Sequence, residues 1–404
     1  MKVLLVNAWH DDNRGDAALV HSAIQLLKGK YPHAQISILS MIPKTHEYWY
    51  KAHNSIKKSH GEIELIPSPL PMDAGSISFL DLPKMLAAFL SIYFPFFSRF
   101  SGFHKYIAQS DLIVGVGGHY LFTINNNAKS LFRLLRLTQP FKLANHLGIK
   151  TTLFSQSLGP FHGAAAQKNM KSIFDQSKVI VREALSRNLV EQIVGKASDV
   201  QIKPDSAFYL GNIEPQSSEL NIGEEYCVVT LREPMEGNVT QIRENYLQQM
   251  KLAVEGLLSS NKVKKAIVFP HVIGPTELED DRRISDDFFK LCEHPQVDLL
   301  NENLDINSTL SLYKNAKFVI GTRFHSVVFA LCQETPAVAI SYYGPKAKGI
   351  MQYIKMSSLC LDINSINATD INELVTQCLK AEENGEIKKQ KERLLEELGS
   401  LSFE

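Results

Sequence analysis

The stretch FVIGTRFHSVVFALCQETPAVAISYYGPKAKGI, residues 318–350, carries the pattern from which the fold can be predicted. An apolar run at 318–321 is followed by a helix-like segment, and a second apolar run follows at 337–340. Short apolar runs that alternate with helix-length segments indicate βαβ units and a parallel sheet. Arg323 and His325 stand where the first run ends, which is where a parallel strand delivers side chains to a ligand.

The same alternation extends along most of the chain in two series, separated by a polar stretch at 211–225 that contains Pro, Gly and Ser. The predicted strands of the first series are 2–7, 35–40, 62–67, 111–116, 150–155, 178–183 and 200–205. Those of the second series are 226–233, 264–271, 297–301, 318–321 and 337–340.

A length of 404 residues also favours two domains over one. The sequence therefore predicts an α/β protein with two doubly wound, Rossmann-like domains and a functional cleft between them. We place the N-terminal domain at 1–212 and the C-terminal domain at 213–370. A helical tail at 371–404 is expected to pack back on the body.

Bulk composition excludes several classes of protein. Lys+Arg and Asp+Glu are equal at 43 each, and no basic stripe is present, so no nucleic-acid partner is expected. Five scattered cysteines without CxxC spacing indicate a reduced, cytoplasmic protein. The first ten residues predict a strand rather than a signal peptide.

The most apolar segment is 79–103, which is interrupted by Pro83, Lys84, Pro95 and Arg99. It is too broken to form a spanning helix of about 20 apolar residues. Two interpretations stay open: a buried helix followed by a loop, or an interfacial helix that lies on a membrane.

Asn13, Gly15 and Asp16 follow the first predicted strand and open a helix. The glycine permits close backbone approach, and free N–H groups at a helix start can hold an anion or a sugar hydroxyl. Asp16 is equally explained as a helix cap.

Two further strand ends in the first series carry candidate ligand contacts. Gly117, Gly118 and His119 follow the strand at 111–116, and adjacent glycines there let a ligand or a backbone approach closely. Gln156 ends the next strand. Both loops are predicted to lie on the same rim of the sheet.

In the second series Arg232, His271 and Arg323 each close an apolar run. Arg323 precedes a helix, so its guanidinium and the N–H groups at the helix start can face one point. That combination suits a phosphate or carboxylate better than a neutral ligand. His325 is either a structural histidine or, beside an anion, a proton donor.

These motifs together resemble the polysaccharide pyruvyl transferases, most closely the colanic-acid type, over about residues 1–360. The matching segments, in order, are NRGDAAL (13–19), GVGGHYLF (115–122), SQSLGPF (155–161), VREALS (181–186), PDSAF (204–208), TLRE (230–233) and GTRFHSVVFAL (321–331). The family often has an acidic residue or Ser after the paired glycines, whereas this chain has His119 and Tyr120, a departure that concerns the acceptor.

The resemblance implies a GT-B-like fold and transfer of pyruvate from phosphoenolpyruvate (PEP) to a sugar as a cyclic ketal, with release of phosphate. The acceptor would be a bacterial surface polysaccharide, such as a capsule or other exopolysaccharide of the cell envelope, or its lipid-linked precursor. PEP is a co-substrate, and neither a cofactor nor a metal is expected. The acidic run 277–283 is interpreted as a solvated loop or helix start.

The resemblance assigns donor contacts to Arg323, Phe324, His325 and an upstream arginine, and the strand-end positions supply the other candidates. The donor-binding set is Arg323, Phe324 through its backbone, His325, Ser326, Lys346 and a second arginine, for which Arg232 is preferred to Arg182. The acceptor-binding set is Asn13, Gly15, Asp16, Gly117, Gly118, His119 and Gln156. As a hypothesis, His325 is the general acid, Asp16 the base for the sugar and His271 a reserve acid.

Two alternatives remain at this point: a GT-B glycosyltransferase that uses a nucleotide sugar, and a non-catalytic glycan-binding member of the family. A PEP donor would place the reaction in the cytoplasm, with peripheral contact to the inner face of the cytoplasmic membrane through residues 79–103.

Overall fold

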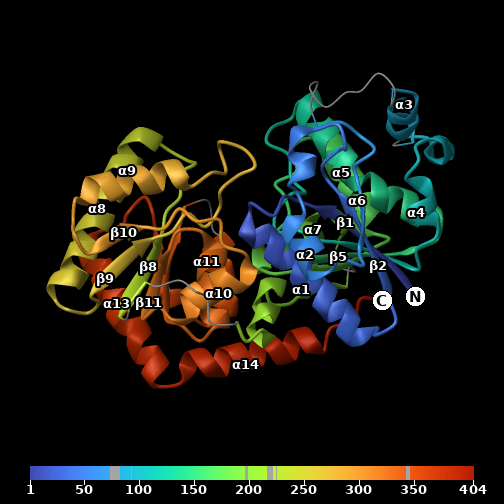
Figure 1. The fold of residues 1–404 in the computed structure, drawn as a ribbon. Helices are drawn as coiled ribbons and strands as arrows, with labels where there is room; N and C mark the ends of the chain where they lie inside the picture. The colour runs from blue at the N-terminus through green and yellow to red at the C-terminus, as the bar shows by residue number, and fades with distance from the viewer. Residues whose placement is uncertain (73–81, 92, 196–198, 216–221, 224, 343–345) are drawn as a thin grey trace. The chain divides into compact units, whose positions relative to one another are not determined.

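The computed structural model describes residues 1–72, 82–91, 93–195, 199–215, 222–223, 225–342 and 346–404 (Figure 1). The chain divides into two compact units. The first contains Met1–Asp11, Leu19–Ser206 and Ser400–Glu404, and the second contains Asp12–Ala18 and Ala207–Gly399. Parts of three predicted segments, namely 79–81 and 92, 216–221 and 224, and 343–345, lie outside the described residues.

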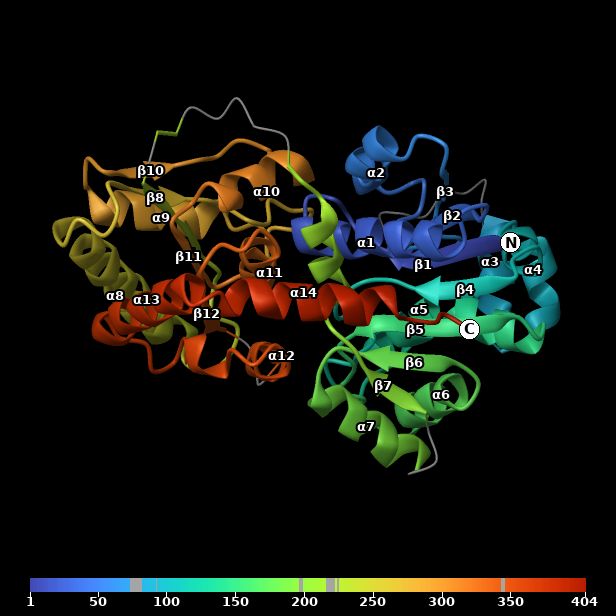
Figure 2. The same cartoon turned by 90° about the horizontal axis from the view of Figure 1, so that it is seen from below.

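Within the described residues, the first unit contains a seven-stranded parallel sheet with the order β3-β2-β1-β4-β5-β6-β7 (Figure 2). Its strands are β1 (Lys2–Ala8), β2 (Gln35–Ser40), β3 (Glu64–Ile66), β4 (Leu112–Gly115), β5 (Lys150–Gln156), β6 (Lys178–Val181) and β7 (Val200–Ile202). Its helical segments are α1 (Arg14–Lys30, whose first residues are grouped with the second unit), η1 (Glu47–Tyr50), α2 (Asn54–Ser59), α3 (Leu82–Leu90), η4 (Pro95–Phe100), α4 (His104–Ala108), α5 (Ala128–His146), α6 (Ala164–Phe174) and α7 (Ala184–Val194).

The second unit, within the described residues, contains a six-stranded parallel sheet with the order β10-β9-β8-β11-β12-β13. Its strands are β8 (Tyr226–Thr230), β9 (Lys265–Val268), β10 (Val297–Leu299), β11 (Phe318–Gly321), β12 (Ala337–Ser341) and β13 (Cys360–Asp362). Its helical segments are η5 (Ser206–Asn212, whose first residue is grouped with the first unit), α8 (Val239–Ser259), α9 (Arg282–Cys292), α10 (Ile306–Lys314), α11 (Phe324–Cys332), α12 (Lys346–Tyr353), η6 (Ser357–Leu359), α13 (Ala368–Glu383) and α14 (Glu386–Gly399).

Both sheets are doubly wound. In each unit the first three strands in the chain are added to one side of the sheet, and the later strands are added on the other side of the first strand. The switch lies between β1 and β4 in the first unit and between β8 and β11 in the second. The predicted α/β class with two Rossmann-like sheets is therefore confirmed. In such sheets ligands bind beyond the carboxyl ends of the strands at the switch point.

The C-terminal tail was predicted to be helical. The predicted helical tail forms two helices, α13 and α14, both in the second unit. The last five residues belong to the first unit, where the ring of Phe403 packs edge-on against Phe154 at a centroid distance of 4.9 Å. In the described part of the chain, every helix is too short or too polar to cross a membrane.

Candidate active site

The switch point of the second sheet carries the two arginines singled out above. Arg232 lies two residues after β8 and Arg323 two residues after β11, and these neighbouring strands pair Thr230 with Gly321. The Thr322 N–H donates to the Thr230 carbonyl at 3.0 Å, which continues the pairing past the strand ends. Both arginines are consequently buried on the same edge, at 6% and 8% exposure.

Asp281 joins the two guanidinium groups. Its carboxylate is fully buried and accepts from Arg323 Nε at 2.8 and 3.0 Å and from Arg323 Nη2 at 2.8 Å, while Arg232 Nη1 lies 3.8 Å from it. Val272 holds the acid from its other side by donating its N–H to Oδ2 at 3.1 Å. Two buried guanidinium groups thus share this one buried carboxylate, and the charge of Glu279 also acts on both of them.

The electrostatics of the cluster favour an added anion. Burial raises the pKa of Asp281, and the Arg323 guanidinium opposes that rise. Burial and the charge of Arg323 lower the pKa of Arg232. A bound anion would raise the pKa of Arg232 again, because its charge would offset the repulsion from Arg323 and replace the solvation that Arg232 loses on burial.

Arg232 also has an unused donor. Its Nη1 donates to the Leu278 carbonyl, and its guanidinium lies 5.6 Å from the centre of the Tyr342 ring. Its Nε is buried and has no hydrogen-bond partner among the described residues. An unpaired buried N–H is costly, so this atom is well placed to receive a ligand oxygen.

His325 lies in the first turn of α11, for which Arg323 is the N-cap residue. A Cβ added to Gly15 would lie 2.2 Å from His325 Nδ1 and 3.0 Å from His325 Cβ. The first turns of α1 and α11 therefore approach so closely that a side chain at position 15 would displace the His325 ring. Asp16 belongs to that same turn of α1, so the proposed base and acid come from two neighbouring helix starts.

The segment Asp12–Ala18 is fixed within the second unit by several contacts. Asn13 pairs with Val272 in an antiparallel bridge, and the Ile273 N–H donates to the Asp12 carbonyl at 3.0 Å. Asn13 Oδ1 also accepts the Asp16 N–H at 3.3 Å, which caps the helix. These contacts give Asn13 a structural function at the site.

Arg14 was not predicted from the sequence. Its buried guanidinium donates to the carbonyls of Pro270 at 3.0 Å, His271 at 2.8 Å and Leu304 at 3.0 Å, and it lies 4.9 Å from the Phe269 ring centre. Burial lowers its pKa to about 10. Within the polar run DDNRGD no local signal separates this arginine from a solvated one.

His271 is fully buried rather than exposed to a ligand. Its Nδ1 is 2.9 Å from the Tyr313 hydroxyl, and its ring packs edge-on against Phe329 at 5.2 Å. Burial, together with the charge of Arg14, holds its pKa well below the ordinary value. Its Nε2 is buried and has no hydrogen-bond partner among the described residues, and its function as a reserve acid stays a prediction.

The other predicted donor residues have different surroundings. Ser326 is buried, and its hydroxyl donates to the Arg323 carbonyl at 2.6 Å and lies 2.7 Å from Thr230 Oγ1, so it supports the arginine backbone. Phe324 is the half-buried first residue of α11, and Lys346 is the first residue of α12.

The predicted acceptor residues of the first unit form a loop with mainly internal contacts. Gly117 and Gly118 follow β4, and a Cβ on Gly118 would lie 3.2 Å from the Arg182 guanidinium. His119 Nε2 is 2.8 Å from the Gly159 carbonyl, and its ring stacks on Phe122 at 4.6 Å.

Gln156 and Arg182 have structural partners in the first unit. The buried Gln156 amide donates to the Gly115 carbonyl at 2.9 Å and to Tyr120 Oη at 2.8 Å. Arg182 pairs with Asp205 at 2.6 Å and donates to Ser157 Oγ at 2.9 Å. Of the two arginines considered for the donor, Arg232 is the one that shares a carboxylate with Arg323.

The acidic run 277–283 corrects one expectation. Asp280 and Arg282 form an ion pair at 2.5 Å, but Asp281 is fully buried. Of the two interpretations given for this run, the helix start applies to Asp281, which is the N-cap residue of α9, and the solvated loop does not. Among the described residues, no group of three or more His, Cys, Asp or Glu side chains could hold a metal ion.

The two parallel sheets and their switch points define a protein of the GT-B fold class. Solved structures agree: UDP-GlcNAc 2-epimerase from Neisseria meningitidis bound to UDP-GlcNAc matches with a TM-score of 0.55 at 13% identity, over 98% of this chain and 99% of that chain. Phytolacca americana UGT2 complexed with UDP-2fluoro-glucose and pterostilbene matches with a TM-score of 0.53 at 10% identity, over 98% and 94%. At these identities the likeness shows the fold alone.

The family is shown by sequence. The model of the family described as polysaccharide pyruvyl transferase matches residues 13–344, and the chain belongs to that family. Amylovoran biosynthesis protein AmsJ from Erwinia amylovora is 22% identical over 402 residues, which cover 91% of this chain and 89% of that protein. The predicted resemblance and the prediction of a transferase enzyme that acts on polysaccharide are confirmed.

Proposed function

We propose that the enzyme transfers the pyruvyl group of PEP to two hydroxyls of one sugar, forming a cyclic ketal and releasing phosphate. The observation that carries this proposal is the buried pair Arg232 and Arg323 on the single carboxylate of Asp281. PEP carries a phosphate and a carboxylate, and two buried guanidinium groups beside the start of α11 suit such a polyanion.

The proposed steps use the groups around that cluster. A proton adds to the methylene carbon of PEP, its central carbon becomes electrophilic, and a sugar hydroxyl adds to it. The carbon–oxygen bond to phosphate breaks, and a second hydroxyl closes the ketal as it loses its proton. His325 is the general acid, and Asp16 is the base for the sugar. The two guanidinium groups stabilise the phosphate and carboxylate charges.

The acceptor is a sugar of a surface polysaccharide or of its lipid-linked precursor. The reaction takes place in the cytoplasm, at the inner face of the membrane, and requires no cofactor besides its co-substrate PEP. Two of the solved GT-B structures contain UDP-GlcNAc and UDP-2fluoro-glucose, so a nucleotide-sugar donor is the matched alternative to test.

The decisive experiment measures PEP-dependent release of phosphate with galactosides, glucosides and N-acetylmannosamine conjugates. Arg323→Ala should lower kcat/KM roughly 100-fold, the equivalent of about 3 kcal/mol for lost charged hydrogen bonds. Arg323→Lys keeps the charge but not the bidentate geometry and should retain intermediate activity. Arg282→Ala removes a neighbouring exposed arginine and is the control.

Thermal unfolding of each variant separates loss of function from loss of fold. Unchanged kcat/KM in a folded Arg323→Ala protein would refute the donor site. Turnover of a UDP-sugar in the absence of PEP would refute the proposed reaction.

A further inference from the structure

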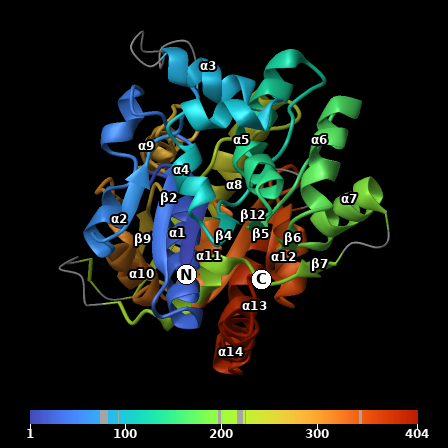
Figure 3. The same ribbon diagram turned by 90° about the vertical axis from the view of Figure 1, so that its right-hand side faces the viewer.

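Helix α3 is oriented against the usual pattern for a surface helix. Its small residues Ala87 and Ala88 are buried against the first unit, whereas Leu82 and Leu86 are exposed. The Gln139 amide of α5 donates to the Ala88 carbonyl and to Ser91 Oγ, which fixes this orientation. In the ribbon, α3 lies at the edge of the first unit (Figures 1 and 3).

The following segment, which includes η4, continues this apolar surface. We define the α3–η4 surface by six side chains that are 47% to 60% exposed: Leu82, Leu86, Tyr93, Phe94, Phe96 and Phe100. Within this set the Phe96 and Phe100 rings lie 5.8 Å apart, and several exposed apolar side chains in one short segment mark an interaction site, because only single exposed apolar residues are ordinary.

The charges within this segment have one sign. From residue 82 to residue 106 the sequence contains Lys84, Arg99 and Lys105 but no Asp or Glu. Arg99 lies 5.6 Å from the Phe96 ring centre, and Lys105 lies 4.5 Å from that of Tyr106. Arg99 thus lies among the aromatic side chains of the α3–η4 surface, as cations do in interfacial membrane segments, whereas Tyr106 of α4 donates to Glu64 at 3.0 Å.

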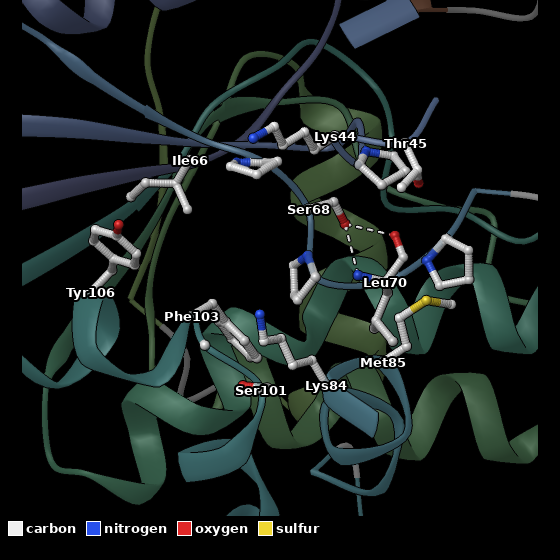
Figure 4. Close-up of a pocket in the computed structure, with 15 residues that line it drawn as sticks. Lys44, Thr45, Ile66, Ser68, Leu70, Lys84, Met85, Ser101, Phe103 and Tyr106 are labelled. Atoms are coloured by element: carbon white, nitrogen blue, oxygen red, sulfur yellow. Dashed lines mark hydrogen bonds between the residues drawn. The ribbon is translucent and has the colours of Figure 1, made fainter. Parts of the chain in front are cut away.

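A pocket of about 270 Å³ opens beside α3, and its walls include both Lys44 and Lys84 (Figure 4). Four prolines of its lining come from two loops, which fixes much of the backbone. Ser68 closes one loop by donating to the Leu70 carbonyl at 2.9 Å. The two lysines extend from opposite walls (Figure 4), so an anionic group in the pocket would have a positive charge on two sides.

We propose that the α3–η4 surface docks on an anionic phospholipid bilayer, with its aromatic side chains in the interfacial layer and Lys44 and Lys84 on lipid phosphates. Charge complementarity selects this occupant. A second copy of the chain at the same surface would bring Lys84, Arg99 and Lys105 against their own equivalents, which like-charge repulsion opposes. The docking proposal rests on the membrane-side location given under the proposed function and names an anionic bilayer as the partner. It does not depend on transfer from PEP at Arg232 and Arg323.

The test is sedimentation of the full chain with vesicles of phosphatidylcholine and phosphatidylglycerol, compared with phosphatidylcholine alone. Wild type should bind the anionic vesicles, and binding should weaken as salt is raised. Phe96→Ser/Phe100→Ser should lower partitioning at least about tenfold, because two ring contacts with the bilayer are lost. Lys44→Gln and Lys84→Gln should each lower it about fivefold.

Ile124→Ser is the matched control, since Ile124 is an exposed apolar residue of the same unit outside this surface. Equal binding to both kinds of vesicle, or an Ile124→Ser effect as large as that of Phe96→Ser/Phe100→Ser, would overturn the proposal. So would self-association that this double variant abolishes, because the occupant would then be a second copy.

Phosphate release from PEP with a water-soluble acceptor should be unchanged in Phe96→Ser/Phe100→Ser. Vesicle binding is measured without turnover, so the two proposals fail separately. Vesicle binding without PEP-dependent phosphate release would support the docking surface and refute the proposed reaction. PEP-dependent phosphate release without vesicle binding would support the reaction and refute the docking surface.

Discussion

Replacing Gly15 by alanine tests whether the His325 ring must stay where the structure places it. The added Cβ would lie 2.2 Å from His325 Nδ1 and 2.6 Å from Cγ. Ordinary contact begins at 3.4 Å, so the ring must move by 3.4 − 2.2 = 1.2 Å. A displacement of about 1 Å at a reacting group lowers turnover by roughly 100-fold.

The same substitution should not weaken the fold through the helix itself. Gly15 is in the first turn of α1 without a positive φ, and alanine in place of glycine within a helix adds about 0.5–1 kcal/mol of stability. A rotation of the His325 side chain relieves most of the clash. We therefore expect a large loss of kcat with little change in Tm.

The assay measures PEP-dependent phosphate release alongside thermal unfolding. Gly399→Ala, at the end of α14, is the control because a Cβ there meets nothing within 4 Å. Wild-type kcat in Gly15→Ala would refute the assignment of His325 as the acid. A parallel fall of kcat and Tm would show that the close approach serves folding instead.

Three further predictions concern stability. Asp281→Asn leaves Arg323 buried without its counter-charge and should lower the free energy of unfolding by about 3–5 kcal/mol in urea titrations, with PEP restoring stability more strongly than in wild type. Burial lowers the pKa of His21 and His53 to about 3, so the unfolded chain binds protons that the folded chain does not. Stability should be full above about pH 6.5 and fall toward pH 3, by up to about 1.4 kcal/mol per pH unit for each histidine; urea titrations of His21→Gln/His53→Gln should show a flatter profile. Phe403→Ala should destabilise the protein by about 3–5 kcal/mol, measured by thermal unfolding, because the ring is buried against Phe154.

The fold was predictable because the strands of a parallel sheet are buried on both faces and appear as continuous apolar runs. The run at 318–321 is β11 with unchanged bounds, and that at 2–7 falls short of β1 by one residue. The tail was predicted as one helical element, yet it is broken between α13 and α14. Gly385 adopts a φ of +70° there, a conformation that favours glycine, so the Asn384-Gly385 pair was a usable local signal.

Site residues were predictable only where their place at the end of a strand determines that they lie at the site. Arg232 and Arg323 were identified because each follows an apolar run. Asp280 and Asp281 are neighbours of the same type, yet one pairs with Arg282 at the surface and the other is buried. The partner that decides the fate of Asp281 is Arg323, 42 residues further along the chain, and no local pattern contains that information.

Two buried arginines that each follow a strand, Arg182 and Arg232, differ in how their charges are paired. Arg182 is matched to Asp205, one charge to one charge, and its Nε is also occupied by Ser157. Arg232 has a share of a carboxylate that Arg323 already binds, and its Nε is left without a partner among the described residues. An arrangement that only had to be stable would resemble the first, because an unmatched buried cation costs free energy. The second resembles a site whose missing charge is supplied by a substrate, and this difference is why PEP should stabilise the protein at Arg232 and not at Arg182.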